Sequence, residues 1–203
     1  MTAVTIIGAG NMGGAIARIA TAGSNDVQVI VRDVTSVEGG TVTVAPYGAA
    51  ITGDIVVLAL PQAALADILA TYADQLVGKT VVDITNPVDF ATFDSLVVPV
   101  GSSQAQELAT ALPQSHVLKA FNTNFAATLA SGTVGGEKTV VLIAGDDTDA
   151  KVALAAVVQG GGLKAIDAGS LKRAHELEAL GFLQMTLAAA EKTSWTSGFA
   201  LAE

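Results

Sequence analysis

Short apolar runs alternate along the chain with segments in which apolar residues recur every three or four positions. The first run, Ala3–Ile7, is followed by a glycine-rich stretch at positions 8–13 and by Met12, Ile16 and Ile19 at helical spacing. A short apolar run is typical of a buried strand, and the wider spacing is typical of an amphipathic helix. The start of the chain therefore predicts a strand, a tight turn and a helix.

The same two patterns continue along the sequence. Further strands are predicted at Asp26–Val31, Thr41–Val44, Asp54–Leu60, Lys79–Ile84, His116–Phe121, Lys138–Ala144 and Leu163–Asp167. Helices are predicted at Ala63–Leu76, Ser103–Leu112, Ala126–Ala130 and Asp149–Val158, with Thr148 as N-cap of the last, a helical turn at Pro46–Ile51 and a loop at Phe90–Val100. Because the strands are nearly continuously apolar, we expect a mostly parallel, doubly wound Rossmann sheet of the α/β class.

The last part of the chain predicts one long helix over Ser170–Lys192, followed by a tail that contains Trp195 and Phe199. We expect residues 1–168 to form the Rossmann domain and residues 169–203 to form a C-terminal helical extension of the same compact unit. The helix has apolar residues on more than one face, and such a helix is usually buried on more than one side. One side can cover the sheet and the other a second subunit, so we expect a homodimer.

The glycine-rich stretch matches the pattern G-x-G-x-x-G between a strand and a helix. Gly8 permits the tight turn, Gly10 lets a pyrophosphate approach the backbone, and Gly13 lets the helix pack closely on the strand. The free N–H groups of the helix N-terminus attract phosphates. A purely structural turn is the alternative, and the pattern favours a dinucleotide site. The predicted site consists of Gly8, Ala9, Gly10, Asn11, Met12 and Gly13.

Arg32 directly follows the second predicted strand and precedes Asp33. At this place an acidic residue binds the ribose 2′-hydroxyl of NAD, whereas an arginine accommodates the 2′-phosphate of NADP. The order of the two residues favours NADP(H) over NAD(H). The alternative is that both are solvated residues at the end of a strand.

Ligands of open parallel sheets bind beyond the carboxyl ends of the strands. Later strand ends in this chain carry Leu60, Pro61, Asn86, Pro87, Asn122 and Thr123. The prolines suit chain segments that pass under a flat ring. The asparagines and the threonine could hydrogen-bond the nicotinamide carboxamide or a second ligand, or could be turn residues that satisfy their own backbone.

Composition narrows the classes of protein. The chain has 203 residues, of which 51% are hydrophobic, and its net charge is −9 with scattered basic residues. A nucleic-acid partner is therefore not expected. No apolar run approaches the ~20 residues that span a bilayer, so we expect no membrane association and a cytoplasmic location. Cysteine is absent, which excludes disulfides, thiolate metal sites and a cysteine nucleophile.

Candidate acids and bases are scarce. His116 and His175 are the two histidines, and neither has a catalytic partner in its sequence neighbourhood. No histidine pair has zinc-binding spacing. Asp146 and Asp147 suggest a helix entry, and Lys119 and Asp83, which lie inside predicted strands, suggest a structural ion pair or hydrogen bond. We therefore predict no metal site and no single essential catalytic side chain. Hydride transfer between redox rings fits this scarcity, because the cofactors supply the chemistry.

Several stretches resemble the F420-dependent NADP oxidoreductase family. They are IIGAGNMGGAIARIATAG (6–23), VRD (31–33), VVLALP (56–61), VVDITNP (81–87), KAFNT (119–123), IAGDD (143–147) and DAGSLKRAHELEALG (167–181). The resemblance implies NADP held by the glycine loop and Arg32, and a deazaflavin (F420) or flavin stacked on the nicotinamide near Pro61, Pro87 and Asn122. Two features depart from the family: the segment at 34–53 is short, and Asn122 stands where F420-using members have histidine.

The sequence leaves three functions open. The first is an NADP-dependent oxidoreductase that passes hydride to a flavin, a deazaflavin or another small redox acceptor, with the tail Thr193–Glu203 helping to form the wall of the acceptor site. The second is a non-catalytic NADP(H)-binding sensor or partner subunit. The third is an imine reductase similar to pyrroline-5-carboxylate reductase, which GAGNMGGAI at 8–16 resembles. For the tail, the alternative is that it only covers its own core.

Overall fold

The computed structural model describes residues 1–37 and 40–201. Glu38 and Gly39, inside the short segment at 34–53, and Ala202 and Glu203, at the end of the tail, lie outside the described residues. The described strands form an eight-stranded sheet in the order β10-β9-β6-β5-β4-β1-β2-β3. Their bounds are β1 Ala3–Ile7, β2 Asp26–Val31, β3 Thr43–Pro46, β4 Ile55–Leu58, β5 Thr80–Asp83, β6 His116–Lys119, β9 Val140–Gly145 and β10 Lys164–Gly169.

Strands β3, β2, β1, β4, β5 and β6 are parallel neighbours in that order. This 3-2-1-4-5-6 order is that of the doubly wound dinucleotide-binding sheet. β9 is antiparallel to β6, and β10 extends the edge parallel to β9. The predicted fold, a mostly parallel Rossmann sheet of the α/β class, is confirmed.

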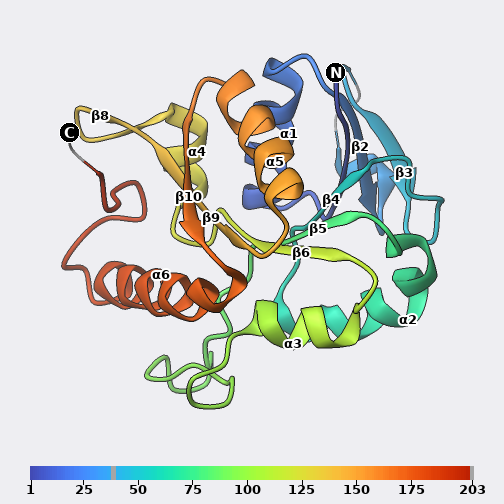
Figure 1. Cartoon of the computed structure of the whole chain (residues 1–203). Helices are drawn as coiled ribbons and strands as arrows, with labels where there is room; N and C mark the ends of the chain where they lie inside the picture. Colours follow the sequence, from blue (N-terminus) through green and yellow to red (C-terminus); the bar gives the residue numbers. More distant parts are fainter. Residues whose placement is uncertain (38–39, 202–203) are drawn as a thin grey trace.

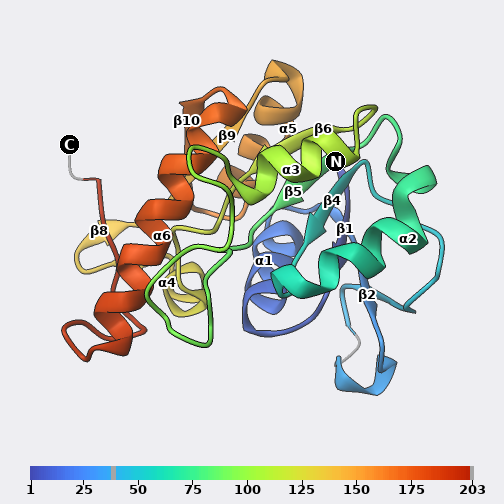
Figure 2. The ribbon, with the colours of Figure 1, turned by 90° about the horizontal axis from the view of Figure 1, so that it is seen from below.

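Helices cover both faces of the sheet (Figure 1). The helices are α1 Asn11–Ala22, α2 Leu65–Leu76, α3 Gln104–Ala111, α4 Ala126–Ser131, α5 Thr148–Gly160 and α6 Ala174–Ala189. One face carries α1, α4 and α5, and the other carries α2, α3 and α6 (Figures 1 and 2). Alternate strand residues face alternate cores: Ile6 packs in the core under α1, and its neighbour Ile7 packs in the core under α2.

Shorter elements complete the described chain. They are the single 3₁₀ turns η1 Val34–Ser36, η2 Gln62–Ala64 and η3 Leu171–Arg173, and a small hairpin of β7 Thr133–Val134 with β8 Glu137–Lys138. Residues 90–100 form an irregular loop, as predicted. No described helix is both long and apolar enough to cross a membrane.

The predicted helical turn at Pro46–Ile51 is wrong, and the third strand lies two residues later than predicted. This segment follows a non-helical path because distant side chains bind its backbone. The Tyr72 hydroxyl accepts from the N–H of Gly48 at 2.6 Å, and the side-chain Oε1 of Gln75 accepts from the N–H of Ile51 at 2.9 Å. Gln28 donates to the carbonyl of Ala50 at 2.9 Å. These partners lie far away in sequence, so local pattern could not reveal them.

The structure also differs from the sequence prediction at the start of α5 and at both ends of α6. Asp147, not Thr148, caps α5, because its carboxylate accepts from the N–H of Ala150 at 2.7 Å. The predicted long helix Ser170–Lys192 is shorter: its first residues form η3, and α6 itself spans Ala174–Ala189. Just after α6, Glu191 has φ of 56°, and this left-handed conformation ends the helix before Lys192.

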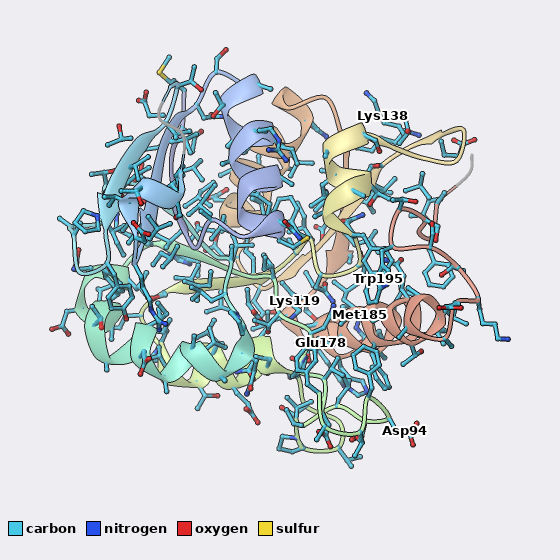
Figure 3. The ribbon with its side chains drawn as sticks, turned by 180° about the vertical axis from the view of Figure 1, so that it is seen from behind. Asp94, Lys119, Lys138, Glu178, Met185 and Trp195 are labelled. Carbon is cyan, nitrogen blue, oxygen red and sulfur yellow. The ribbon has the colours of Figure 1, made fainter. Side chains whose placement is uncertain are left out.

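A buried charge cluster fastens α6 to the sheet (Figure 3). The ammonium of Lys119 on β6 lies 2.8 Å from the carboxylate of Asp83 on β5 and 2.7 Å from that of Glu178 on α6. All three side chains are 0% exposed. Glu178 also accepts the N–H groups of Gln104 at 3.0 Å and Ala105 at 3.4 Å, at the start of α3. Of the two roles expected for Lys119 and Asp83, the structure shows the ion pair, and Glu178 is the partner that the sequence did not suggest.

The cluster holds two carboxylates and one ammonium. Burial raises the pKa of Glu178 above its ordinary value and the nearby charge of Asp83 adds to that rise, while Lys119 and the N–H of Gln104 oppose it. The ammonium is therefore the group on which the cluster depends, because without it two buried carboxylates would have no counter-charge.

We predict that Lys119→Met lowers the free energy of unfolding by about 3–5 kcal/mol, the cost of breaking a buried ion pair from one side. Glu178→Gln is the matched control, because its amide oxygen still accepts an N–H of α3 and one of the two carboxylates is removed. Glu178→Gln should lower the free energy of unfolding by about 1–2 kcal/mol. Urea unfolding of the native protein and the two variants measures both losses. A loss for Lys119→Met no larger than that for Glu178→Gln would contradict this account of the cluster.

Candidate functional site

A cavity of about 1050 Å³ lies at the carboxyl ends of the central strands. Its walls come from the loop before α1, the exits of β4, β5 and β6, helix α4, Met185 of α6 and Trp195 in the tail. Trp195 lies between α4 and α6, with Met185 beside it on α6 (Figure 3). The cavity thus occupies the place where an open parallel sheet binds its ligand.

The glycine loop has the shape that its sequence predicts. Gly8 has φ of 108°, and a Cβ at this position would collide with the carbonyl oxygen of Ala59. A Cβ on Gly13 would collide with the carbonyl oxygen of Gly8, so α1 approaches the end of β1 without a side chain between them. A Cβ on Gly10 would meet nothing within 4 Å. The position facing the expected pyrophosphate is therefore open space.

The N-terminus of α1 has unused hydrogen-bonding capacity. Gly10 is its N-cap, no side chain caps the helix, and its first turn contains no acidic residue. The first N–H groups of a helix have no partner within the helix. Together with the helix dipole, they form a site that favours a phosphate.

Nine of the thirteen predicted site residues line the cavity: Ala9, Gly10, Asn11, Met12, Gly13, Leu60, Pro61, Asn86 and Asn122. Four do not: Gly8, Arg32, Pro87 and Thr123. Gly8 lies beneath the loop and shapes it, and Thr123 is buried away from the cavity. Arg32 lies beyond the end of β2, apart from the cavity wall, where an adenosine ribose would extend.

Several lining residues were not predicted. They include Gly14, Arg18, Gln62, Thr85, Phe90, Asn124, Phe125 and three alanines of α4. Thr85 and Asn124 adjoin predicted residues, so the strand-end rule applied one residue more widely would have found them. Arg18 and the alanines lie inside helices, and only the packing of α1 beside α4 brings them to the cavity. Trp195 and Thr196 place part of the predicted tail in its wall.

Asn86 and Asn122 form a reciprocal pair at the base of the cavity. The Asn86 amide donates to the carbonyl of Asn122 at 2.8 Å, and the Asn122 amide donates to Asn86 Oδ1 at 2.9 Å and to the carbonyl of Leu177 at 2.8 Å. Gly181 of α6 packs against this pair, where a Cβ would lie 2.5 Å from Asn86 Oδ1. The pair therefore binds the two strand exits to α6.

The exit of β6 contains a strained residue. Phe121 is buried and has φ of 62°, a conformation that bulky side chains rarely adopt. Its left-handed conformation turns the chain immediately before Asn122. Backbone strain of this kind is concentrated at functional sites, where the surrounding structure maintains it.

Unsatisfied polar atoms are concentrated near the cavity. Four buried side-chain oxygens of the described residues have no hydrogen-bond partner, and three of them belong to cavity-lining residues: Thr85 Oγ1, Asn122 Oδ1 and Asn124 Oδ1. An unmade hydrogen bond of a buried group is costly. A ligand with amide donors and acceptors, such as a nicotinamide carboxamide, matches the chemistry of this part of the wall.

The two histidines lie away from the cavity. His116 Nδ1 lies 2.9 Å from the carboxylate of Asp147, at the opposite end of β6, and His175 Nδ1 lies 2.9 Å from the carbonyl of Ser102. Among the described lining residues there is no histidine, carboxylate, lysine or tyrosine. In the part of the chain that the structure describes, no three potential ligands gather as a metal site would require.

Arg32 is largely free in solvent, with 78% of its side chain exposed. Its nearest acidic partner is Asp67 on α2, at 3.8 Å and also exposed. An exposed ion pair of this kind contributes little. The guanidinium is therefore available to a stronger anion at the end of β2.

Comparison with known proteins supports this description. Residues 3–87 match the family model described as NADP oxidoreductase, coenzyme F420-dependent. The chain is 31% identical over 136 residues to an F420-dependent NADP reductase of Methanocaldococcus jannaschii. This aligned region covers 65% of this chain and 60% of that protein. It is 37% identical over 112 residues to the metalloreductase STEAP3 of Rattus norvegicus, across 55% of this chain and 22% of that protein. The predicted resemblance is confirmed.

The chain thus spans less than two thirds of the length of these two curated relatives. A solved structure from Arthrobacter sp. FB24, named as a candidate F420-dependent NADP-reductase, superposes over 100% of both chains with a TM-score of 0.86 at 24% identity. A pyrroline carboxylate reductase of Plasmodium falciparum shares the fold over 82% of this chain and 58% of its own, with a TM-score of 0.58 at 14% identity. The comparisons thus show a resemblance to NADP oxidoreductases at residues 3–87 and a shared fold over most of the chain.

Proposed function

We propose that this chain, which resembles the F420-dependent NADP oxidoreductases over residues 3–87, transfers hydride between NADP(H) and a flavin, a deazaflavin such as F420, or a similar small redox acceptor. The observation that supports this most directly is the cavity itself. It joins an open glycine loop and an uncapped helix N-terminus to a wall of aromatic and amide side chains.

The cofactor half of the proposal rests on three groups of this chain. The backbone at Gly10 and the start of α1 would bind the pyrophosphate. Arg32 would bind the 2′-phosphate, and the amide-rich exits of β5 and β6 would hold the nicotinamide. Ala59 to Pro61, at the exit of β4, would support one face of that ring. In this arrangement, the residues fix position and exclude water, and none of them takes part in a covalent step.

The part of the proposal that concerns the acceptor rests on the cavity walls formed by α4 and the C-terminal extension. When both ligands are bound, NADPH would supply a hydride, and the acceptor ring would take up that hydride with a proton from water. Phe125 and Trp195 offer flat apolar surface to such a ring, with their centroids 5.0 Å apart. Rings exchange hydride without a protein acid, and an imine substrate usually needs a positioned one. The described lining residues therefore favour a redox ring over an imine.

A non-catalytic NADP(H) sensor is the second candidate. It would need the glycine loop and Arg32 but not the acceptor wall. The presence of Trp195 and Met185 in that wall, each brought from the C-terminal extension, favours the oxidoreductase.

We further propose that the protein is a homodimer. On α6, Leu183 is 51% exposed, and Leu180, Phe182 and Leu187 are only partly buried. Apolar residues around a helix that remain in contact with water indicate a second packing surface. A two-fold pairing of α6 helices would cover them.

Steady-state oxidation of NADPH with a panel of F420, FMN, FAD and quinones, and separately with pyrroline carboxylate, tests the function. We expect turnover with at least one acceptor. His116→Gln and His175→Gln should keep that turnover within about ten-fold, because a true general acid contributes about 10²–10⁴. NADPH binding without turnover on any acceptor would favour the sensor, and turnover on pyrroline carboxylate alone would favour the imine reductase.

Arg32→Ala should weaken NADPH binding by about ten- to a hundred-fold, because a charge-assisted contact to phosphate contributes about 1.5–3 kcal/mol. NADH has no 2′-phosphate, so its affinity should barely change. Asp67→Asn is a matched control, since it removes the acidic neighbour of Arg32 and should not weaken NADPH binding. Calorimetric titration measures all three proteins. Equal weakening of NADPH and NADH would show that Arg32 does not read the 2′-phosphate.

Light scattering at micromolar concentration tests the dimer. We expect twice the chain mass for the native protein and the mass of one chain for Leu183→Glu. Val152→Glu on α5 is the control, because Val152 is 63% exposed on the opposite face of the sheet. A monomeric native protein, or a dimer that survives Leu183→Glu, would refute pairing through α6.

A further inference from the structure

Arg18 is placed on the same face of α1 as the phosphate-binding end of the helix. Asn11, Gly14 and Arg18 are three and four residues apart, and all three line the cavity. Seven residues of α-helix correspond to about 10 Å, so Arg18 lies that far along the helix from Asn11. A Cβ on Gly14 would meet nothing within 4 Å, so the space between them is open.

Arg18 is also the one charged side chain among the described residues that line the cavity. Among the described residues it has no ion-pair partner, although the chain has a net charge of −9; Arg173 pairs with Glu176 at 2.9 Å, and Arg32 makes only the exposed contact with Asp67 at 3.8 Å. Arg18 is exposed to solvent at the wall of a mostly apolar cavity, and an uncompensated cation at such a place attracts an anion. Arginine in particular binds phosphate and carboxylate oxygens in a fixed geometry.

The wall on the α4 side leaves room for a ligand. It is formed by Ala126, Ala127 and Ala130, whose side chains are small. Phe125 precedes these alanines, and Trp195 packs against it. A ligand between α1 and α4 would therefore meet aromatic surface and a guanidinium in one continuous cavity.

The phosphates of NADP(H) already have places in the proposed function. The pyrophosphate would lie at the N-terminus of α1, and the 2′-phosphate would lie at Arg32, beyond the end of β2. Arg18 is two helical turns from the first of these places and lines the cavity together with Phe125 and the alanines of α4. It therefore has no assigned anion in the cofactor.

We propose that Arg18 binds an anionic arm of the acceptor, so that the site selects ring acceptors bearing a phosphate or carboxylate group over neutral ones. This inference rests on the proposed function, because it assigns the second ligand of that site. Arg18 is then a specificity residue: it binds the arm and leaves the reacting ring to the other walls.

The test uses ligand pairs that differ in the arm. FMN and riboflavin differ by a phosphate, and F420 and its deazaflavin riboside differ by the phosphate- and carboxylate-bearing arm. Trp195 is the only tryptophan of the chain and lines the cavity, so its fluorescence reports binding without any need for turnover. Each ligand is titrated into the full chain saturated with NADP⁺.

We expect the native protein to bind at least one charged ligand more tightly than its neutral partner, by about ten- to a hundred-fold. Arg18→Gln should reduce that ratio to near one, and Arg18→Lys should restore part of it. Arg173→Gln, a surface arginine paired with Glu176, is the control and should keep the native ratio. If Arg18→Gln lowers the affinity ratio only for FMN over riboflavin, Arg18 binds a phosphate arm. If it lowers the ratio only for F420 over its riboside, Arg18 binds the longer arm.

Three results would overturn the inference. They are an unchanged ratio in Arg18→Gln, no preference in the native protein for either charged ligand, and weakening of NADP⁺ itself by Arg18→Gln, which would assign Arg18 to the cofactor. Failure of the proposed function would look different: NADPH oxidation would be absent with every acceptor, whereas the binding ratios would still be measured.

Discussion

The contact between Lys119, Asp83 and Glu178 is the constraint on which the cavity depends. It joins two adjacent strands to α6, and Glu178 extends it to the start of α3. Lys119 also donates to the carbonyl of Thr85, a residue of the cavity wall. With α6 held at this point, Met185 and the tail with Trp195 lie across from the glycine loop. A buried ion cluster contributes little net stability compared with apolar packing, but it fixes which groups meet.

The cavity combines two kinds of construction. At the glycine loop, absence of side chains creates the site: Gly8 and Gly13 bring strand and helix together, and Gly10 leaves the approach open. On the acceptor side, side chains from α4, α6 and the tail create it. The first part provides backbone N–H groups for phosphate, and the second provides flat rings, amides and one guanidinium. The division matches a site for two ligands, in which the protein positions the rings and the rings exchange the hydride.

The sequence predicted what local geometry determines. The glycine loop, the buried strands and the ligand edge of the sheet follow from periodicity and from backbone conformations open only to glycine. What it missed depends on distant partners. Tyr72 and Gln75 hold the segment after β3 in a non-helical path, and Glu178 completes the charge cluster. Arg18 lines the cavity because α4 packs beside α1. Asp147 replaced Thr148 as a cap because both residues can cap a helix, and only the carboxylate geometry distinguishes them.

The central claim is that NADP(H) binds in the cavity next to the glycine loop. The most direct measurement is titration of NADPH while Trp195 emission is followed, in the native protein and in Gly10→Ala, whose added Cβ would enter the open space above the loop and meet no protein atom within 4 Å. The account predicts saturable quenching in the native protein, a normally folded variant, and binding to the variant weakened by at least about ten-fold. NADPH that binds both proteins equally well, or binds without changing Trp195 emission, would contradict it.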